Sequence, residues 1–162
     1  MTIYSFKSDQ YSSHMKIVRL LSANRKASPV RVLDVGCSKG FLGQNFQGKW
    51  FYFHGLEFDT HDASIAKKYY EKITVMDLDT ERIRLPSHTF DIIVLADIIE
   101  HLKNADTVMK SLLPPLKDGG VVIASTANVA NIWIRLKLLF GNFDYENRGI
   151  LDRTHVKLYT LK

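Results

Sequence analysis

The sequence predicts an α/β fold, a doubly wound and mostly parallel Rossmann-like sheet with helices on both faces. The first observation is that short apolar runs alternate with amphipathic segments along the chain. The second is that runs such as DIIVLA and GVVIAS are apolar at nearly every position. A strand of a parallel sheet is buried on both faces, so it is apolar throughout rather than at alternate positions. At 162 residues the chain has the size of one domain, which we expect to cover 1–162.

The first expected element is an amphipathic helix at Met15–Lys26, followed by a short apolar strand at Val30–Val35 that enters a glycine loop. A second helix, Gly40–Gln47, begins at the end of this loop. The same alternation of apolar runs and amphipathic segments gives the rest: strands at Trp50–Leu56, Lys72–Met76, Phe90–Ala96 and Val121–Ser125, a helix at Asp62–Glu71, and a turn at Asp118, Gly119 and Gly120.

A further helix is expected after the last strand, where Trp133, Leu136 and Phe140 recur at near-helical spacing. We interpret these side chains as facing the core. The alternative is a lid over a substrate, whose contacts would come from Asn128, Trp133, Phe143 and Tyr145.

Composition excludes several classes of protein. No run of about 18 apolar residues is present to span a bilayer, and the first ten residues lack the apolar stretch of a signal peptide. A single cysteine, Cys37, cannot form an internal disulfide, so we expect a cytoplasmic protein. The net charge of +5 is spread in small groups without aromatic interleaving, which favours solvated helix faces over a nucleic-acid interface.

Acidic residues follow four of the expected strands. In a doubly wound sheet, ligands bind beyond the carboxyl ends of the strands, so these residues should converge. The loop from Asp34 to Gly40 can turn sharply and leads to a helix N-terminus, a geometry that suits a nucleotide-like ligand. Glu57 lies 23 positions beyond Asp34, near the spacing of about 20 residues at which an acidic residue binds a ribose diol. The other two acidic ends are Asp77 to Asp79 and Asp97 to Glu100.

The segments VLDVGCSKG, GLEFD, MDLD and FDIIVLADIIEHL together resemble the ordered motifs of class I S-adenosylmethionine-dependent methyltransferases. The resemblance implies that Asp34, Gly36 and Gly40 surround the methionyl part of S-adenosylmethionine and that Glu57 binds its ribose. By the same resemblance, Asp77 and Leu78 contact the adenine, Phe58 lines the adenine pocket, and Cys37, Ser38 and Ala96 complete the cofactor site. Ser38 stands where the family usually has glycine.

The tail from Thr126 to Thr160 resembles methyltransferases associated with glycan and polysaccharide synthesis, and also the methyltransferase-like proteins of methionine biosynthesis. This implies methyl transfer by direct displacement to a small-molecule or sugar acceptor. An RNA methyltransferase and a cofactor-binding regulatory protein without catalysis are the alternatives. The family sheet normally has two strands beyond the position of Tyr159, so we expect the chain to be truncated at its C-terminus.

Two other ligand classes fit the glycine-containing segments less well. A nicotinamide dinucleotide fingerprint, Gly-x-Gly-x-x-Gly, would need glycine at Ser38 and Phe41. A phosphate-binding P-loop over 43–49 would need Ser or Thr at Trp50 and would follow a strand rather than a helix. We interpret that segment as a helix end capped by Gly48.

Asp97, Glu100 and His101 have the spacing i, i+3, i+4, which on a helix places them on one face. In one interpretation they only stabilise a turn. In another, His101 is a general base aided by Glu100, with His155 as the second candidate, because a histidine accepts protons near neutral pH. The third is a divalent-metal site, because the pattern is similar to metal sites of ubiquinone-biosynthesis and small-RNA methyltransferases. We assign no metal.

Overall fold

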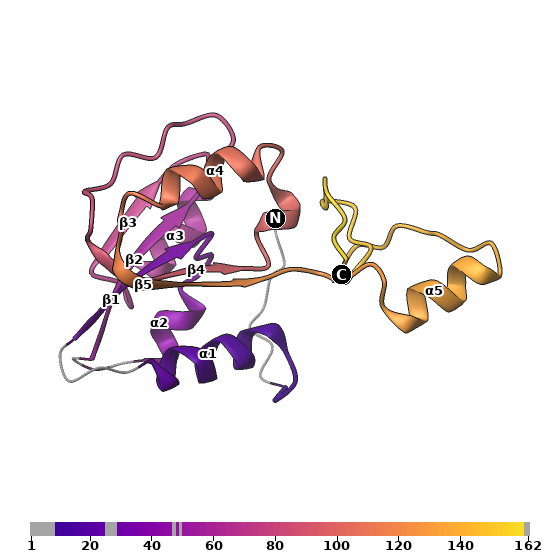
Figure 1. Ribbon diagram of the computed structural model, residues 1–162, viewed down its shortest axis with the longest axis horizontal. Helices are drawn as coiled ribbons and strands as arrows, with labels where there is room; N and C mark the ends of the chain where they lie inside the picture. The colour runs from indigo at the N-terminus through magenta and orange to yellow at the C-terminus, as the bar shows by residue number, and fades with distance from the viewer. Residues whose placement is uncertain (1–8, 25–28, 47, 49, 161–162) are drawn as a thin grey trace.

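The computed structural model describes residues 9–24, 29–46, 48 and 50–160, and it confirms the α/β fold. Five strands form one sheet in the order β3-β2-β1-β4-β5, and every neighbouring pair is parallel (Figure 1). The strands are β1 (Val30–Val35), β2 (Phe51–Glu57), β3 (Lys72–Val75), β4 (Phe90–Ala96) and β5 (Leu116–Ser125). The reversal of strand order falls between β1 and β4, where the fold places a ligand site.

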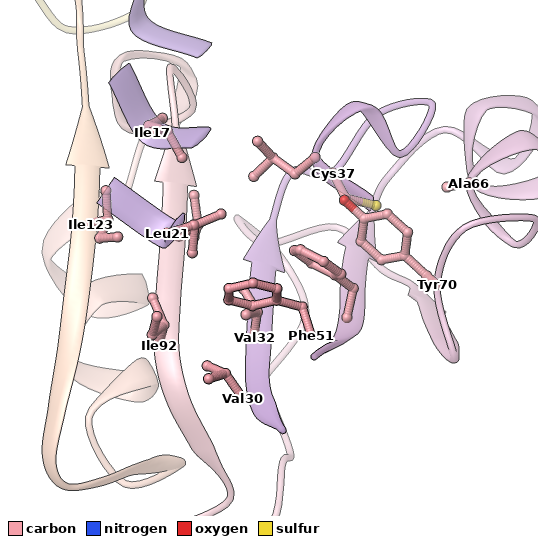
Figure 2. Close-up of a cluster of buried hydrophobic side chains, with 13 residues drawn as sticks. Ile17, Leu21, Val30, Val32, Cys37, Phe51, Ala66, Tyr70, Ile92 and Ile123 are labelled. Atoms are coloured by element: carbon pink, nitrogen blue, oxygen red, sulfur yellow. The ribbon is translucent and has the colours of Figure 1, made fainter. Parts of the chain in front are cut away.

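Helices cover both faces of the sheet. On one face, α1 (Ser13–Ala23), α2 (Phe41–Asn45) and α3 (Thr60–Ala66) contribute to a core with alternate residues of the strands (Figure 2). On the other face, α4 (Ala105–Leu112) packs on a second core. Val30 and Val32 of β1 belong to the first core, and Leu33 and Val35 belong to the second. This burial on both sides explains why the central strands are apolar throughout.

Strands β1 and β4 have the predicted bounds, and several helix bounds differ because polar side chains set them. Helix α1 begins two residues early because the Ser12 hydroxyl accepts a hydrogen bond from Met15 N at 3.2 Å. The Asp59 carboxylate caps α3 in the same way. The prediction that Gly48 caps the second helix was wrong, because Phe46 is the C-cap. The predicted helix ends at Lys26 and Gln47 lie outside the described residues.

The start of β5 and the whole of α4 were not predicted. Leu116 pairs with Phe90 and Val121 pairs with Ile92, so the turn expected before the last strand is an irregularity within β5. Gly119 has a φ of +69° there, which favours glycine. Helix α4 buries Ala105, Val108 and Leu112 at helical spacing, so the signal for it was present in the sequence.

The segment after β5 extends away from the sheet and contains α5 (Ile132–Leu139) (Figure 1). The exposed fractions of Trp133, Leu136 and Phe140 are 71%, 39% and 78%. The interpretation of these three side chains as core residues was therefore wrong, and Ile134 is the buried residue of the helix. Among the described residues, no helix combines the length and apolar character needed to cross a bilayer.

Candidate functional site

The loop that follows β1 turns sharply at the carboxyl edge of the sheet. Gly36, Ser38 and Gly40 all have positive φ, at +75°, +46° and +79°. A Cβ at Gly40 would lie 3.0 Å from the Ala66 Cα, so the loop also needs glycine for its close approach to α3. The amides of Gly36 and Cys37 donate to the Leu56 carbonyl at 2.9 and 3.1 Å, which fixes the loop against the end of β2.

Glu57, the last residue of β2, joins the first two loops. Its Oε2 accepts from the Ser38 amide at 2.7 Å, and its Oε1 accepts from the amides of Phe58 and Asp59 at 2.9 Å each. Burial raises the pKa of Glu57, and these three amide bonds act against that rise. A carboxylate oriented by backbone amides still has lone pairs that can accept hydroxyl groups of a diol. The structure thus brings together the predicted loop and the predicted ribose ligand.

Asp34 is more deeply buried than a residue that contacts a bound molecule at the protein surface. Its exposed fraction is 2%, and its Oδ2 accepts from the Tyr70 hydroxyl at 2.5 Å. Burial raises the pKa of Asp34 to about 7. Burial also raises the pKa of the Cys37 thiol, whose side chain is enclosed in the core. Sequence reasoning missed Tyr70, because no motif marks it within the helix expected at Asp62–Glu71.

The predicted adenine contacts lie after β2 and β3. The Asp77 carboxylate accepts from the Asp79 amide at 2.9 Å, and this bond is the main reason that the pKa of Asp77 is lowered. Leu78 packs partly on the second core, and Phe58 is 71% exposed. Ala96 ends β4 and is half-buried. The four residues follow or end β2, β3 and β4 at the carboxyl edge of the sheet, as predicted.

The segment after β4 does not place its three polar residues on one helix face, and that prediction was wrong. Asp97 has a left-handed φ of +51°, and only Ile99–His101 form a short 3-10 helix. The Asp97 carboxylate accepts from the Ser125 hydroxyl at 2.5 Å and from the Ser13 hydroxyl at 2.6 Å. Asp97 therefore links β4 to β5 and to α1.

Glu100 is a buried residue that faces inward, with an exposed fraction of 2%. Its Oε1 accepts from the Ala127 amide at 3.1 Å, and its Oε2 is a buried oxygen with no hydrogen-bond partner among the described residues. The Glu100 carbonyl accepts from the amides of Val156 and Lys157 at 2.9 and 3.1 Å. Glu100 thus attaches the C-terminal segment to the end of β4.

This attachment brings His101 and His155 together, with ring centroids 4.8 Å apart and the rings nearly perpendicular. The Nδ1 atom of His101 lies 3.2 Å from the Thr154 carbonyl, and that of His155 lies 3.0 Å from the Ile150 carbonyl. A carbonyl oxygen only accepts, so in each neutral ring Nδ1 carries the hydrogen and Nε2 carries the lone pair. That tautomer suits a proton acceptor.

An open hollow beside His155 is lined by Phe143, Asp144, Tyr145 and Arg153 as well. The rings of Phe143 and Tyr145 meet edge to face at 5.7 Å. Two of the four residues expected in a substrate lid therefore line this hollow; Asn128 and Trp133 do not. The part of the chain that the structure describes contains no group of three or more His, Cys, Asp or Glu side chains that could hold a metal ion.

Comparison with known proteins gives consistent matches. Residues 7–162 match the family model described as a methyltransferase domain. The ubiquinone biosynthesis O-methyltransferase of Glaesserella parasuis is 27% identical over 123 residues, which are 68% of this chain and 52% of that protein. The protein of the same name from Nitrosomonas europaea is 30% identical over 106 residues, which are 60% of this chain and 43% of that protein.

Among solved structures, a SAM dependent methyltransferase from Archaeoglobus fulgidus matches with a TM-score of 0.67. The sequence identity is 16%, and the match covers 92% of this chain and 63% of that one. This likeness concerns the fold. The chain spans about half the length of the curated relatives that it matches.

Proposed function

Because this chain belongs to the methyltransferase domain family, we propose that it transfers the methyl group of S-adenosylmethionine to an oxygen atom of a small molecule. Family membership confirms the predicted enzyme class and its cofactor at the level of the family. The relatives are named O-methyltransferases of ubiquinone biosynthesis, which supports a small-molecule acceptor with a hydroxyl group. A sugar acceptor remains a prediction.

The main support for a cofactor site is the Glu57 carboxylate, which the amides of two loops hold at the carboxyl edge of the sheet. We propose that Glu57 accepts hydrogen bonds from the ribose hydroxyls. The backbone of Gly36, Ser38 and Gly40 would lie against the methionyl part, where positive φ keeps side chains away. Because Asp34 and Cys37 are buried, they would act from beneath the loop. We place Phe58, Asp77, Leu78 and Ala96 around the adenosine.

When bound, S-adenosylmethionine supplies a methyl group on a positively charged sulfur that a nucleophile can attack in line. The contribution of the chain is to hold the acceptor hydroxyl in that line and to accept its proton. We propose Nε2 of His101 as the proton acceptor, with His155 as the second candidate. Glu100 is buried and would act as a positioning residue for the histidine pair. A well-placed base contributes about 10² to 10⁴ in rate.

The hollow beside His155 is our candidate acceptor site. Its two aromatic rings suit a flat apolar or aromatic acceptor, and Arg153 suits an anionic group. The hollow lies next to the proposed bases, since His155 lines it and touches His101. We therefore expect hydroxylated aromatic acids to be better acceptors than neutral aliphatic alcohols.

The cofactor assignment is tested by calorimetric titration with S-adenosylmethionine, S-adenosylhomocysteine and NADH. We expect binding of the first two only, and an affinity at least tenfold weaker in Glu57→Gln. The matched control is Glu71→Gln, because Glu71 is exposed between α3 and β3. Absence of binding, or equal binding by Glu57→Gln, would contradict the assignment.

The transfer step is tested by following S-adenosylhomocysteine release with a panel of hydroxylated aromatic acids. We expect His101→Ala to lower the turnover rate about a hundredfold while the cofactor affinity changes less than twofold. His88→Ala is the control, because His88 precedes β4 and pairs with Asp118, at the amino ends of the strands and opposite the proposed site. Equal turnover in His101→Ala would exclude His101 as the base, and cofactor binding without transfer to any acceptor would overturn the proposed activity.

A further inference from the structure

Tyr70 connects the core to the loop of the proposed cofactor site. It follows α3 and is buried, with an exposed fraction of 6%. Its ring packs against Phe53 of β2, with centroids 5.2 Å apart, and its hydroxyl points toward the carboxyl end of β1 (Figure 2). There it donates to the Asp34 carboxylate at 2.5 Å, a contact between residues 36 positions apart in the sequence.

The Tyr70 ring also fills the space between the core and the glycine loop. A Cβ placed on Gly40 would lie 3.0 Å from the Tyr70 ring, and one placed on Gly43 would lie 2.6 Å from it. Tyr70 therefore contacts the loop at its last residue and in the first turn of α2, in addition to its bond with Asp34. One side chain holds both the carboxylate and the backbone of the loop.

We propose that Tyr70 is a positioning residue for cofactor binding, which holds the Asp34 carboxylate and the glycine loop in the geometry that receives the cation of the cofactor. This inference rests on the proposed function. A bond from a hydroxyl to a buried carboxylate is among the stronger hydrogen bonds in proteins, and its loss leaves a buried acceptor without a donor.

The charges around Asp34 are almost entirely acidic. Glu57 approaches from the end of β2, and Asp62 of α3 accepts from the Ser38 hydroxyl at 3.1 Å. The Cys37 thiol in the loop is uncharged, because burial raises its pKa. Burial and the Glu57 charge raise the pKa of Asp34, and the Tyr70 hydroxyl lowers it. Tyr70 is thus the group that favours the ionised form of Asp34, and a cationic ligand binds best to that form.

The test compares the cofactor affinities of Tyr70→Phe and Tyr69→Phe between pH 5.5 and 8.5 by calorimetry. Tyr69 is the matched control, because its hydroxyl makes no hydrogen bond that the described part of the chain shows. At pH 7 we expect S-adenosylmethionine to bind Tyr70→Phe about tenfold more weakly than the wild type. The pH at which affinity reaches half its plateau should move upward in Tyr70→Phe and stay unchanged in Tyr69→Phe.

A purely structural role would lower stability without moving that pH midpoint, so an unmoved midpoint would overturn the inference. Asp34→Asn provides a second test should Tyr70→Phe fold poorly, because it removes the acidic partner and keeps its shape. We expect it to abolish the pH dependence of binding, and an unchanged profile would also overturn the inference. If the wild-type chain binds no cofactor at any pH, the proposed function fails, whereas normal wild-type binding with unaffected variants removes only the role of Tyr70.

Discussion

Gly43→Ala should destabilise the protein even though it replaces glycine in a helix. Gly43 lies inside α2 and is buried against the segment that follows α3. An added Cβ would lie 2.6 Å from the Tyr70 ring and 2.8 Å from the Tyr69 carbonyl oxygen. The ring is held by its packing against Phe53 and its bond to Asp34, and the carbonyl belongs to the backbone and can move only with the chain.

Two effects of opposite sign decide the magnitude. Alanine is favoured over glycine in a helix interior by about 1 kcal/mol. Overpacking of a filled core costs about 1 to 3 kcal/mol, and three contacts below 3.0 Å, two with the Tyr70 ring and one with the Tyr69 carbonyl oxygen, place Gly43 in the upper part of that range. The expected net loss in the free energy of unfolding is therefore about 1 to 2 kcal/mol. For a domain of this size, each kcal/mol lowers the melting temperature by about 2 to 4 °C.

Urea unfolding followed by circular dichroism measures this loss directly, with Gln44→Ala as the control. Gln44 is the next residue of α2 and is exposed, so its change should stay within about 0.5 kcal/mol. If Gly43→Ala were as stable as the wild type or more stable, the close packing of α2 against Tyr69 and Tyr70 would be refuted.

Three further predictions concern charge. Burial raises the pKa of Asp34 to about 7, so the folded chain holds a proton that the unfolded chain releases above pH 3.8. The stability that this proton contributes declines as the pH rises from 3.8 to about 7. Asp34→Asn should flatten that decline in urea titrations. If the stability of Asp34→Asn depended on pH as that of the wild type does, the raised pKa of Asp34 would be contradicted. Burial lowers the pKa of His54 to about 4, so the stability that its neutral ring contributes declines as the pH falls from 6.5 through about 4. We expect an NMR titration midpoint near 4, and a midpoint near 6.5 would show that the ring is accessible to solvent. Lys117→Met removes a 3.0 Å ion pair with Asp91 and should cost up to about 1 kcal/mol, a loss that added salt should reduce; a loss independent of salt would contradict an electrostatic origin.

The sequence predicted the central strands well because their surroundings are uniform. Val30–Val35 and Phe90–Ala96 are apolar runs in the middle of a sheet covered on both faces, and their predicted bounds agree with the structure. The placement of Glu57 beside the glycine loop was also predictable, since spacing and parallel topology together bring the ends of β1 and β2 to one edge.

The remaining features depend on contacts between distant parts of the chain. Asp97 adopts a left-handed conformation while bonding to Ser13 and Ser125, and no local pattern signals either partner. Tyr70 bonds to Asp34 across the core, and a tyrosine within a helical pattern gives no hint of that. The exposure of α5 was not predicted because a local pattern is present but misleading: its apolar residues have the spacing of a buried helix.

The irregularity at the start of β5 offers a place for chemical attachment. A side chain at Gly119 would meet no atom within 4 Å, and the neighbouring Asp118 side chain is 98% exposed. The regular strand from Val121 to Ser125 then spans about 13 Å toward the edge where the candidate ligands converge. A fluorophore or surface tether introduced at Asp118 would therefore report on or immobilise the protein while leaving its ligand-facing edge open to solution.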